Sequence, residues 1–244
     1  MAKGLVTNTY LTNIANAIRT KLGVQTTYQP SQMAAAIASI PTGGSSMIEL
    51  DANLKFGYSN WTTLPNNIAS ADYSNITDMS SFFYYNRYLT TMPLVDTSSV
   101  TNMNQMFYYC IRLSSVALLD TSSVTSMQSM FRNCTALTAV PQFATSAVAD
   151  MRYMFEYCSA LTTLPALNTS NVANYGLAGI VDGCTSLSNA SLNNLMTMCI
   201  NATNVTTSSY KTLKSVGLTS GQAAVCEGLS NWSAFTAAGW TSGY

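Results

Sequence analysis

The chain has 244 residues, of which 48% are hydrophobic and only 8% charged, and its ten Lys and Arg balance its ten Asp and Glu. This apolar fraction is ample for a buried core, whereas the sparse, balanced charge argues against binding to nucleic acid or to an anionic membrane. The sequence has no histidine, the commonest general base and zinc ligand, so we expect neither an enzyme nor a cofactor or metal.

Residues 1–46 are predicted to form a helical hairpin followed by the linker TGGSS. Apolar residues recur at helical spacing in two short segments, and the second segment is bounded by prolines. A hairpin this small cannot bury its apolar stripe alone, so we expect it to attach to another subunit or to a virion. The alternative is that it folds back onto the rest of its own chain. The attachment side chains would be Leu11, Ile14, Ile18, Met33 and Ile37.

A 24-residue repeat organises residues 72–191. The segment DTSSVTNMNQMFYYCIRLSSVALL, which begins at Asp96, aligns without gaps with DTSSVTSMQSMFRNCTALTAVPQF, which begins at Asp120. Related segments begin at Asp72, Ala144 and Asn168, so five repeats are expected. Their aligned Val, Met, Phe and Leu columns can be buried only against neighbouring repeats, which is typical of a solenoid.

Within each repeat, the alternating stretch exemplified by LTAVPQF favours a strand, and the SxVTxMxxMF stretch favours a helical or 3-10 turn. The fifth repeat departs from the pattern at Tyr175, Gly176 and Gly179, so we expect the array to deteriorate there. Residues 47–71 are expected to cap the first turn, and residues 192–244 are expected to form a helical cap at the other end. The apolar set of the second cap is Leu192, Leu195, Leu213, Val225, Leu229, Trp232, Phe235 and Trp240.

The repeat motif TSxVTxMxxMFxxCxxL resembles that of the BspA-like leucine-rich-repeat family, and the resemblance covers about half of the chain. The resemblance implies an α+β repeat solenoid, here flanked by the N-terminal helical hairpin and the C-terminal helical cap. It also implies adhesion, since such proteins are bacterial surface or virion-associated proteins. The segment LTNIANAIRTKLGVQTTYQPSQMAAAIASIP is similar to the attachment hairpin of phage tail and other virion proteins, and the carboxy-terminal segment also resembles the ending of phage proteins of this kind.

Three of the six cysteines recur at the repeat period, which favours a ladder of small buried side chains over the alternatives of disulfides or a metal site. The aligned Asp72, Asp96 and Asp120 suit turns or helix caps. A glycosidase that uses paired carboxylates, such as Asp96 and Glu156, is a weaker alternative, because such a pair needs two unlike environments.

The residues that vary between repeats indicate where recognition takes place, because solenoids carry binding residues on exposed columns of a constant frame. Aromatic and charged residues follow each Phe of the repeat, which suits sugar or protein recognition; an aromatic ladder that only stabilises the stack is the alternative. The candidate surface comprises Tyr84, Tyr85, Tyr88, Tyr108, Tyr109, Arg112, Arg132, Arg152, Tyr153, Glu156 and Tyr157.

These features predict a non-enzymatic phage virion protein of a tail, baseplate or fibre, which attaches through its hairpin and presents its repeats to a glycan or protein on the host surface. The opening residues MAKGLVTNTY lack a secretory-signal pattern, and no stretch approaches the roughly 20 apolar residues that span a bilayer. We therefore expect synthesis in the host cytoplasm, no membrane insertion and a place in the virion. Other virion proteins are the expected partners. We also expect the protein to form a homo-oligomer, by analogy a trimer. The alternatives are a purely structural decoration protein of the capsid or tail and a bacterial surface adhesin.

Overall fold

The computed structural model describes Thr62, residues 73–92 and residues 95–244. The predicted hairpin over residues 1–46, with its proposed attachment side chains, lies outside the described residues, as does nearly all of the predicted cap over residues 47–71. Within the described part, no helix is long and apolar enough to cross a membrane.

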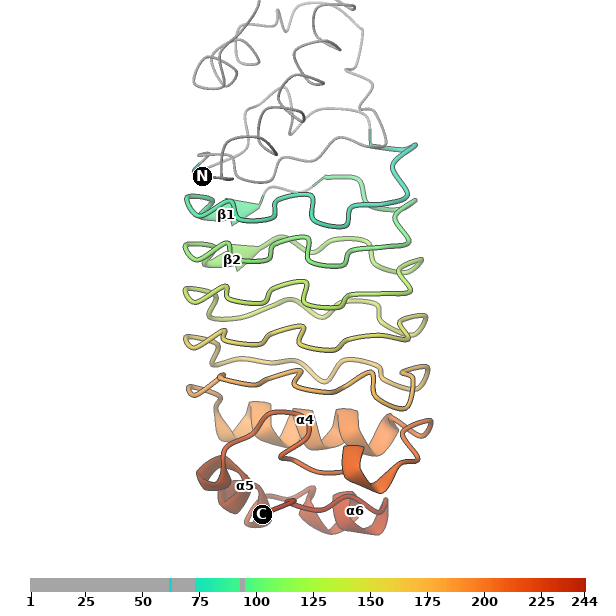
Figure 1. The fold of residues 1–244 in the computed structure, drawn as a ribbon, viewed down its shortest axis with the longest axis vertical. Helices are drawn as coiled ribbons and strands as arrows, with labels where there is room; N and C mark the ends of the chain where they lie inside the picture. The colour runs from blue at the N-terminus through green and yellow to red at the C-terminus, as the bar shows by residue number, and fades with distance from the viewer. Residues whose placement is uncertain (1–61, 63–72, 93–94) are drawn as a thin grey trace, which may run out of the picture.

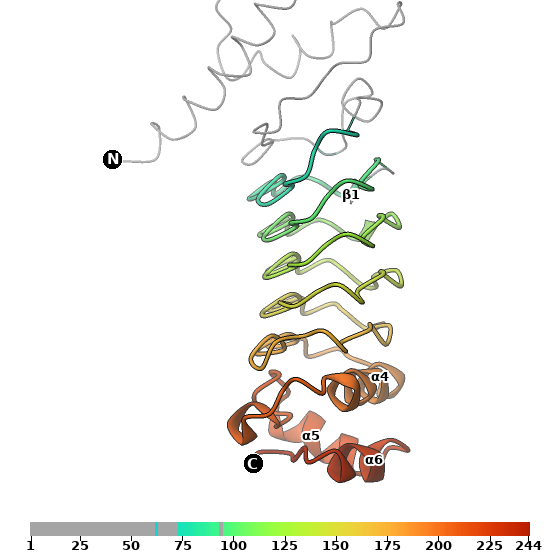
Figure 2. The same cartoon turned by 90° about the vertical axis from the view of Figure 1, so that its right-hand side faces the viewer.

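The described chain winds into a stack of turns, closed at the C-terminal end by helices (Figures 1 and 2). Parallel bridges join residues one repeat apart, from Asp78 to Asn102, then to Ser126, then to Asp150. The amide of Met79 donates to the carbonyl of Asn102 at 2.9 Å, and equivalent bonds recur at the next levels. The 24-residue period of the sequence is therefore the length of one turn of the stack.

Regular strands are short. The strands β1 (Thr91–Met92) and β2 (Ser115–Val116) pair in parallel, and an isolated bridge joins Ala139 to Thr163 in later turns. These pairings fall in the stretch for which the alternating pattern predicts a strand. The prediction therefore identified the right location but overestimated the length of the paired segment.

The helical prediction for the SxVTxMxxMF stretch is wrong. In the first described turn, Phe82 N–H donates to the carbonyl of Met79 at 3.2 Å, and Asn86 N–H donates to that of Phe83 at 3.0 Å, so single turns follow one another. The third residue of each of these turns, Ser81 or Tyr85, has a positive φ of 57° or 60°, which ends any helical run. The intervening amides donate to the next level of the stack instead.

The fifth turn is a complete level of the stack, contrary to the expected deterioration. Met151 N–H donates to Gly176 O at 2.9 Å, and Tyr153 N–H donates to Ala178 O at 3.0 Å. Gly179 and Gly183 take the two positive-φ positions that other residues occupy in earlier turns, two residues later than the period would place them. Glycine adopts this conformation without steric cost, so the insertion leaves the geometry intact.

The aligned apolar columns form the core, as the repeat predicts. Val100, Val124 and Val148 are fully buried, as are the Met and Leu residues that recur in register with them. The phenylalanine column is a continuous stack, with ring centroids 5.4–5.7 Å apart and planes within 10° of parallel. The stacked phenylalanines are Phe83, Phe107, Phe131 and Phe155.

The cysteine column is also part of the core, which confirms the packing prediction. All six cysteines are buried and free, so the disulfide alternative is contradicted. The thiol of Cys134 donates to the carbonyl of Phe107 in the preceding turn at 3.1 Å, and Cys110, Cys158 and Cys184 make equivalent bonds. Burial raises the pKa of Cys110 to about 12, so this thiol stays protonated and is a poor nucleophile at neutral pH.

Polar side chains complete the frame at the DTSS corner. The buried Thr121 hydroxyl donates to the carbonyl of Ala144 at 2.9 Å, and Thr97 makes the corresponding bond to Asp120 O at 2.8 Å. The exposed Asp120 carboxylate accepts from Ser122 N–H at 3.0 Å. Asp96 and Asn168 close the same turn at their own levels, as the sequence pattern predicts for Asp96.

Four helical segments follow the last turn: α4 (Asn189–Asn201), η2 (Ser208–Tyr210), α5 (Ser220–Glu227) and α6 (Trp232–Ala237). Helix α4 is capped by Ser188, and α5 begins with a capping box between Thr219 and Gln222. The segment between η2 and α5 accepts the amides that the fifth turn presents, because Gly179 N–H donates to Ser215 O at 2.8 Å.

The predicted apolar set of this region is mostly correct. Leu192, Leu195, Leu213, Phe235 and Trp240 are buried, and Leu229 and Trp232 pack against the core while partly exposed. Val225 is the exception: it lies on the outer side of the short helix α5, where 42% of the residue is exposed.

Candidate recognition surface

The predicted surface residues come from one side of the stack, where the positive-φ turns lie. Backbone bonds place them level by level: Tyr85 N–H donates to Tyr108 O at 2.7 Å, and Tyr109 N–H donates to Arg132 O at 2.8 Å. Tyr157 N–H donates in the same way to Asp182 O at 2.6 Å. Segments far apart in the sequence therefore bring these side chains into adjacent columns.

The first column runs from aromatic to charged side chains. The rings of Tyr84 and Tyr108 stack with centroids 4.9 Å apart and planes 8° from parallel. The guanidinium of Arg132 lies 5.7 Å from the centroid of the Tyr108 ring, and its Nε is 2.5 Å from Oε2 of Glu156. The acidic Asp182 follows Glu156 in the next turn, so the character of the column changes along the stack.

The second column consists of positive-φ residues: Tyr85, Tyr109, Asn133, Tyr157 and Gly183, with φ between 60° and 73°. The rings of Tyr85 and Tyr109 stack with centroids 4.6 Å apart and planes 4° from parallel. Tyr157 has no stacked ring among the described residues and is 46% exposed. Five levels thus share one backbone conformation at this position, although the residue is tyrosine in three of them, asparagine in one and glycine in one.

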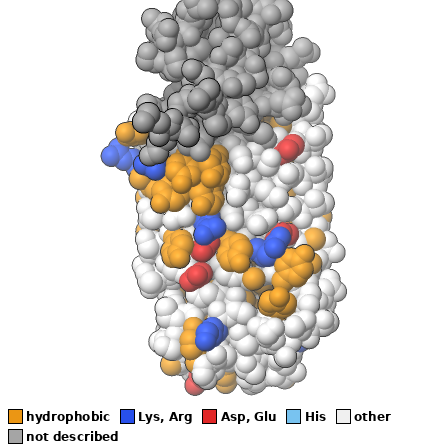
Figure 3. All heavy atoms as spheres, in the orientation of Figure 1, with side chains coloured by type: hydrophobic (Ala, Val, Ile, Leu, Met, Phe, Trp, Pro, Cys, Tyr) orange, Lys and Arg blue, Asp and Glu red, His pale blue; other side chains and the backbone are white. Residues whose placement is uncertain are grey.

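Stacking limits which parts of the rings of Tyr84, Tyr85, Tyr108 and Tyr109 a ligand can contact. The ring of Tyr84 stacks on that of Tyr108 and the ring of Tyr85 on that of Tyr109, so the stacked faces are not available to a ligand. Each is only partly exposed. Figure 3 shows hydrophobic side chains gathered into a patch on one face of the molecule. These residues therefore form the aromatic ladder, and a ligand would meet the side of the ladder.

Two arginines lie against tyrosine rings on this face. The guanidinium of Arg87 is 5.3 Å from the Tyr85 ring centroid and 5.5 Å from that of Tyr109. The guanidinium of Arg112 is 5.5 Å from the ring of Tyr88, which is 44% exposed. The surface predicted from the sequence does not include Arg87, although the structure places this residue beside both tyrosines.

The surface also extends further along the stack than the sequence predicts. Arg152 pairs with Asp150 at 2.6 Å and lies 4.7 Å from the ring of Tyr175, which contacts Tyr210 edge to face at 6.5 Å. Tyr175 and Tyr210 are 47% and 37% exposed. Tyr175 was visible in the sequence as a departure from the repeat, whereas Tyr210 lies outside the repeats and carried no such signal.

Glu156 is almost completely buried, with 5% of the residue exposed. Burial raises the pKa of its carboxyl and nearby Asp182 raises it further, whereas the charge of Arg132 lowers it. Both carboxylate oxygens face Arg132, at 2.5 and 3.3 Å. A raised carboxyl pKa is typical of general acids, but here the guanidinium occupies the position that a reacting oxygen would need.

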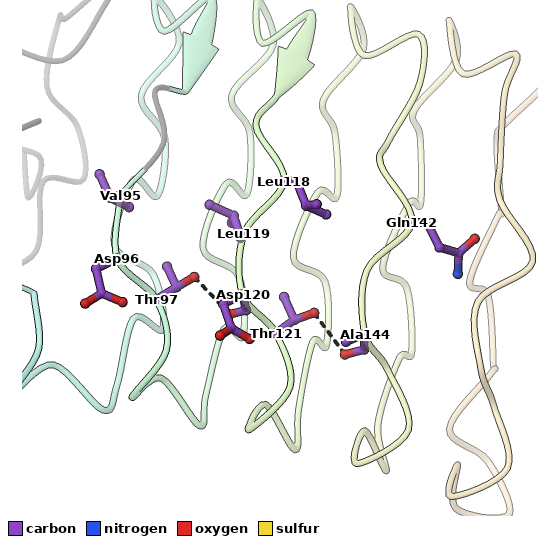
Figure 4. A pocket seen from close by; sticks show the side chains of 9 residues that line it. All are labelled: Val95, Asp96, Thr97, Leu118, Leu119, Asp120, Thr121, Gln142 and Ala144. Carbon is purple, nitrogen blue, oxygen red and sulfur yellow. Dashed lines mark hydrogen bonds between the residues drawn. The ribbon is translucent and has the colours of Figure 1, made fainter.

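A shallow hollow of about 670 Å³ lies at the DTSS corner of three successive turns (Figure 4). It is lined by Asp96 and Asp120 together with apolar side chains that include Leu118, of which 59% is exposed. Each carboxylate accepts from the N–H of a serine two residues later, in equivalent turns of successive levels, so the hollow lacks the two unlike environments that acid–base hydrolysis needs. No group of three or more metal-ligating residues occurs in the part of the chain that the structure describes.

A stack of sequence repeats with an aromatic and charged outer surface defines the class of this molecule, a repeat protein with a candidate recognition face. The chain belongs to the family DUF285, described as a Mycoplasma protein of unknown function. The family model matches residues 52–163 and 90–189, which together span more than half of the chain. This membership agrees with the repeat part of the BspA-like resemblance. Neither match reaches residues 1–46, so the likeness to a phage attachment hairpin has no support from it. No curated protein and no solved structure matches the chain.

Proposed function

We propose that this chain is a non-enzymatic recognition protein whose BspA-like leucine-rich repeats form an α+β solenoid, flanked by a helical hairpin and a helical cap. Its surface of tyrosines and arginines binds a glycan or protein on a host surface. In this proposal the protein belongs to a phage tail, baseplate or fibre, is made in the host cytoplasm and attaches to other virion proteins through its amino-terminal residues. A homo-oligomer is the expected state.

The observation that carries the proposal is that the side chain at one turn position varies between levels while the backbone conformation stays the same. Tyr85, Tyr109, Asn133, Tyr157 and Gly183 share one backbone conformation, although tyrosine is strained at positive φ and asparagine or glycine is not. The geometry of the turn therefore does not require tyrosine. Residues held in strained conformations are enriched at binding sites, which supports selection of these tyrosines for contact with a partner.

Several observations support a non-enzymatic role. The sequence has no histidine, and burial raises the pKa of the described cysteines, which makes them poor nucleophiles. The acidic side chains that could act in hydrolysis are used elsewhere, Asp96 and Asp120 in turns and Glu156 in an ion pair.

The placement in a virion rests on the resemblances of the amino-terminal and carboxy-terminal segments to those of phage proteins. A bacterial surface adhesin is the main alternative, and the mention of Mycoplasma in the family description favours keeping it. A structural decoration protein is the other. Purified phage particles should contain the protein if the virion proposal holds, whereas an adhesin should be found on the surface of the cell that makes it.

Recognition is tested by binding of the full-length protein to intact host cells, measured by flow cytometry. The variant Tyr84→Phe/Tyr108→Phe/Arg112→Ala keeps the stacked rings but removes two hydroxyls and one cation. We expect cell binding to fall at least tenfold while the melting temperature stays within a few degrees. Leu118→Ala, an exposed change outside the candidate surface, is the matched control. Full binding by the triple variant would contradict the proposal.

A further inference from the structure

The arginines of the recognition surface fall into two groups. Arg132 and Arg152 are held by acids, Arg132 by Glu156 at 2.5 Å and Arg152 by Asp150 at 2.6 Å. Arg87 and Arg112 are exposed and have no ion pair among the described residues. Each lies instead against tyrosine rings.

This difference leaves Arg87 and Arg112 available to a ligand. Contact with a tyrosine ring restricts the motion of a guanidinium, but it does not neutralise its charge or use its in-plane N–H donors. Arg152 has already committed its donors, because its Nε and a terminal nitrogen bind the two oxygens of Asp150. Figure 3 shows Lys and Arg side chains gathered beside the hydrophobic patch at the edge of this face.

The frame does not need either cation. Cys110 to Leu113 form a tight turn in which Leu113 N–H donates to Cys110 O at 3.0 Å, and the same bond closes the corresponding turns at Cys134 and Cys158. In the next two turns the position of Arg112 is taken by Ala136 and Ala160, with the closing bond unchanged. The position of Arg87 is likewise taken by uncharged residues in later turns.

From these contacts we infer that Arg87 and Arg112, with the hydroxyl edges of the adjacent tyrosines, form a binding site for the anionic groups of an acidic glycan. The inference rests on the proposed recognition role and names its ligand class. Guanidinium forks bind carboxylates and phosphates with paired hydrogen bonds, and tyrosine hydroxyls bind the sugar hydroxyls beside them. Two cations are too few for nucleic acid, which is bound through many phosphate contacts.

The site lies at one end of the described stack. Arg87 and Arg112 occupy its first two levels, whereas Glu156 and Asp182 occupy the fourth and fifth. Glu156 is buried and paired with Arg132, but Asp182 is exposed and repels an anionic chain, so the glycan binds across the first levels and does not run the length of the stack.

Binding of the full-length protein is measured by calorimetry against three oligosaccharides of equal length: a galacturonate oligomer, a phosphodiester-bearing glycan and a neutral galactose oligomer. We expect binding to at least one anionic oligomer, weaker at 500 mM salt than at 50 mM, and none to the neutral one. The two anionic oligomers distinguish carboxylate from phosphate as the bound group.

Arg87→Ala and Arg112→Ala are each expected to weaken anionic binding about tenfold or more, and Arg87→Lys and Arg112→Lys to weaken it less. Lys214→Ala, which removes an exposed cation that lies against the ring of Tyr244 outside the candidate surface, is the matched control and should bind normally. Thermal unfolding of each variant verifies that it is folded. Equal affinity for the neutral oligomer, no binding to either anionic oligomer, or native affinity of the Ala variants would overturn the inference.

Failure of the inference can be told from failure of the proposed function. If the Arg87→Ala/Arg112→Ala protein still binds host cells while the triple variant described above does not, recognition stands and the acidic-glycan site falls. If the native protein binds no host cells, the proposed function falls, and the calorimetry still decides whether the glycan site exists.

Discussion

Two tyrosines in the same column separate the stabilising role of the aromatic ladder from its role in binding. Tyr109 and Tyr157 have nearly equal positive φ angles of 63° and 60°. Tyr109 stacks on Tyr85 at 4.6 Å and lies under Arg87, whereas Tyr157 is 46% exposed and has no such ring partner among the described residues. Replacing each by Asn, the residue found in this column at position 133, removes the same backbone strain from both.

The difference between Tyr109→Asn and Tyr157→Asn therefore isolates the stacking. Loss of one stacked pair costs about 0.5–1.5 kcal/mol and loss of one exposed cation–π contact about 0.5–1 kcal/mol. We expect Tyr109→Asn to be less stable than Tyr157→Asn by about 1–2.5 kcal/mol, and Tyr157→Asn to lie close to the native protein because the relieved strain offsets its lost packing.

Urea unfolding followed by far-ultraviolet circular dichroism measures both variants, and equal slopes with denaturant are required for the comparison. If Tyr109→Asn unfolds at the same urea concentration as Tyr157→Asn, the ladder contributes nothing to stability. The stacked tyrosines would then have to be explained by binding alone.

Two further predictions concern the corner turns and the C-terminal helices. Hydrogen bonds from Ser122 lower the pKa of Asp120, so this carboxylate stabilises the fold above its unfolded-state pKa, and the contribution is lost as the pH falls. Asp120→Asn should therefore reduce the fall of the melting temperature at acidic pH. A melting temperature that falls as steeply in the variant as in the native protein would refute this. At Gly217, where φ is 102°, an added Cβ would lie 2.4 Å from the backbone nitrogen of Asp182, so Gly217→Ala should destabilise the protein by about 2–4 kcal/mol in urea unfolding. Gly221→Ala, in open space within α5, is the control and should be neutral or slightly stabilising; equal effects would contradict the close contact at Gly217.

The repeat period was sufficient to predict the core. A residue such as Val124 or Cys134 recurs at one position of every repeat, and only burial against neighbouring repeats explains an apolar column of that kind. Asp96 and Asp120 were recognisable as turn formers for a similar reason, because a short carboxylate before Ser accepts from the backbone two residues later.

The local backbone could not be predicted in the same way. The spacing of Val100, Met103, Met106 and Phe107 suits a helix, but consecutive turns bonded to the next level place the same residues inward. Positive φ is normally signalled by Gly or Asn, and Gln105 carries no such signal. The levels of the stack impose this conformation through their hydrogen bonds, which are long-range contacts that no local pattern reveals.

The residues of the candidate surface were predicted, but the contacts that their side chains make with one another were not. The sequence placed Tyr84 and Tyr108 in one column, and both binding and stacking remained open. Stacking depends on the separation of the rings and on their orientation, and only the structure provides these two quantities. Pairing of Arg132 with Glu156 likewise depends on which neighbouring column each side chain faces.

The division between frame and surface has a consequence for how such a protein changes its ligand. The bonds that hold successive levels together come from backbone amides, buried threonine hydroxyls such as that of Thr121, and buried thiols such as that of Cys134. The outward side chains of Arg87 and Arg112 take no part in these bonds, and alanine stands at the position of Arg112 in the next two turns. Substitution at these outward positions therefore alters charge and hydrogen-bonding groups at little cost in stability, whereas substitution in the frame destabilises every level that it touches. The proposed recognition surface can therefore change its side chains while the stack that positions it stays the same.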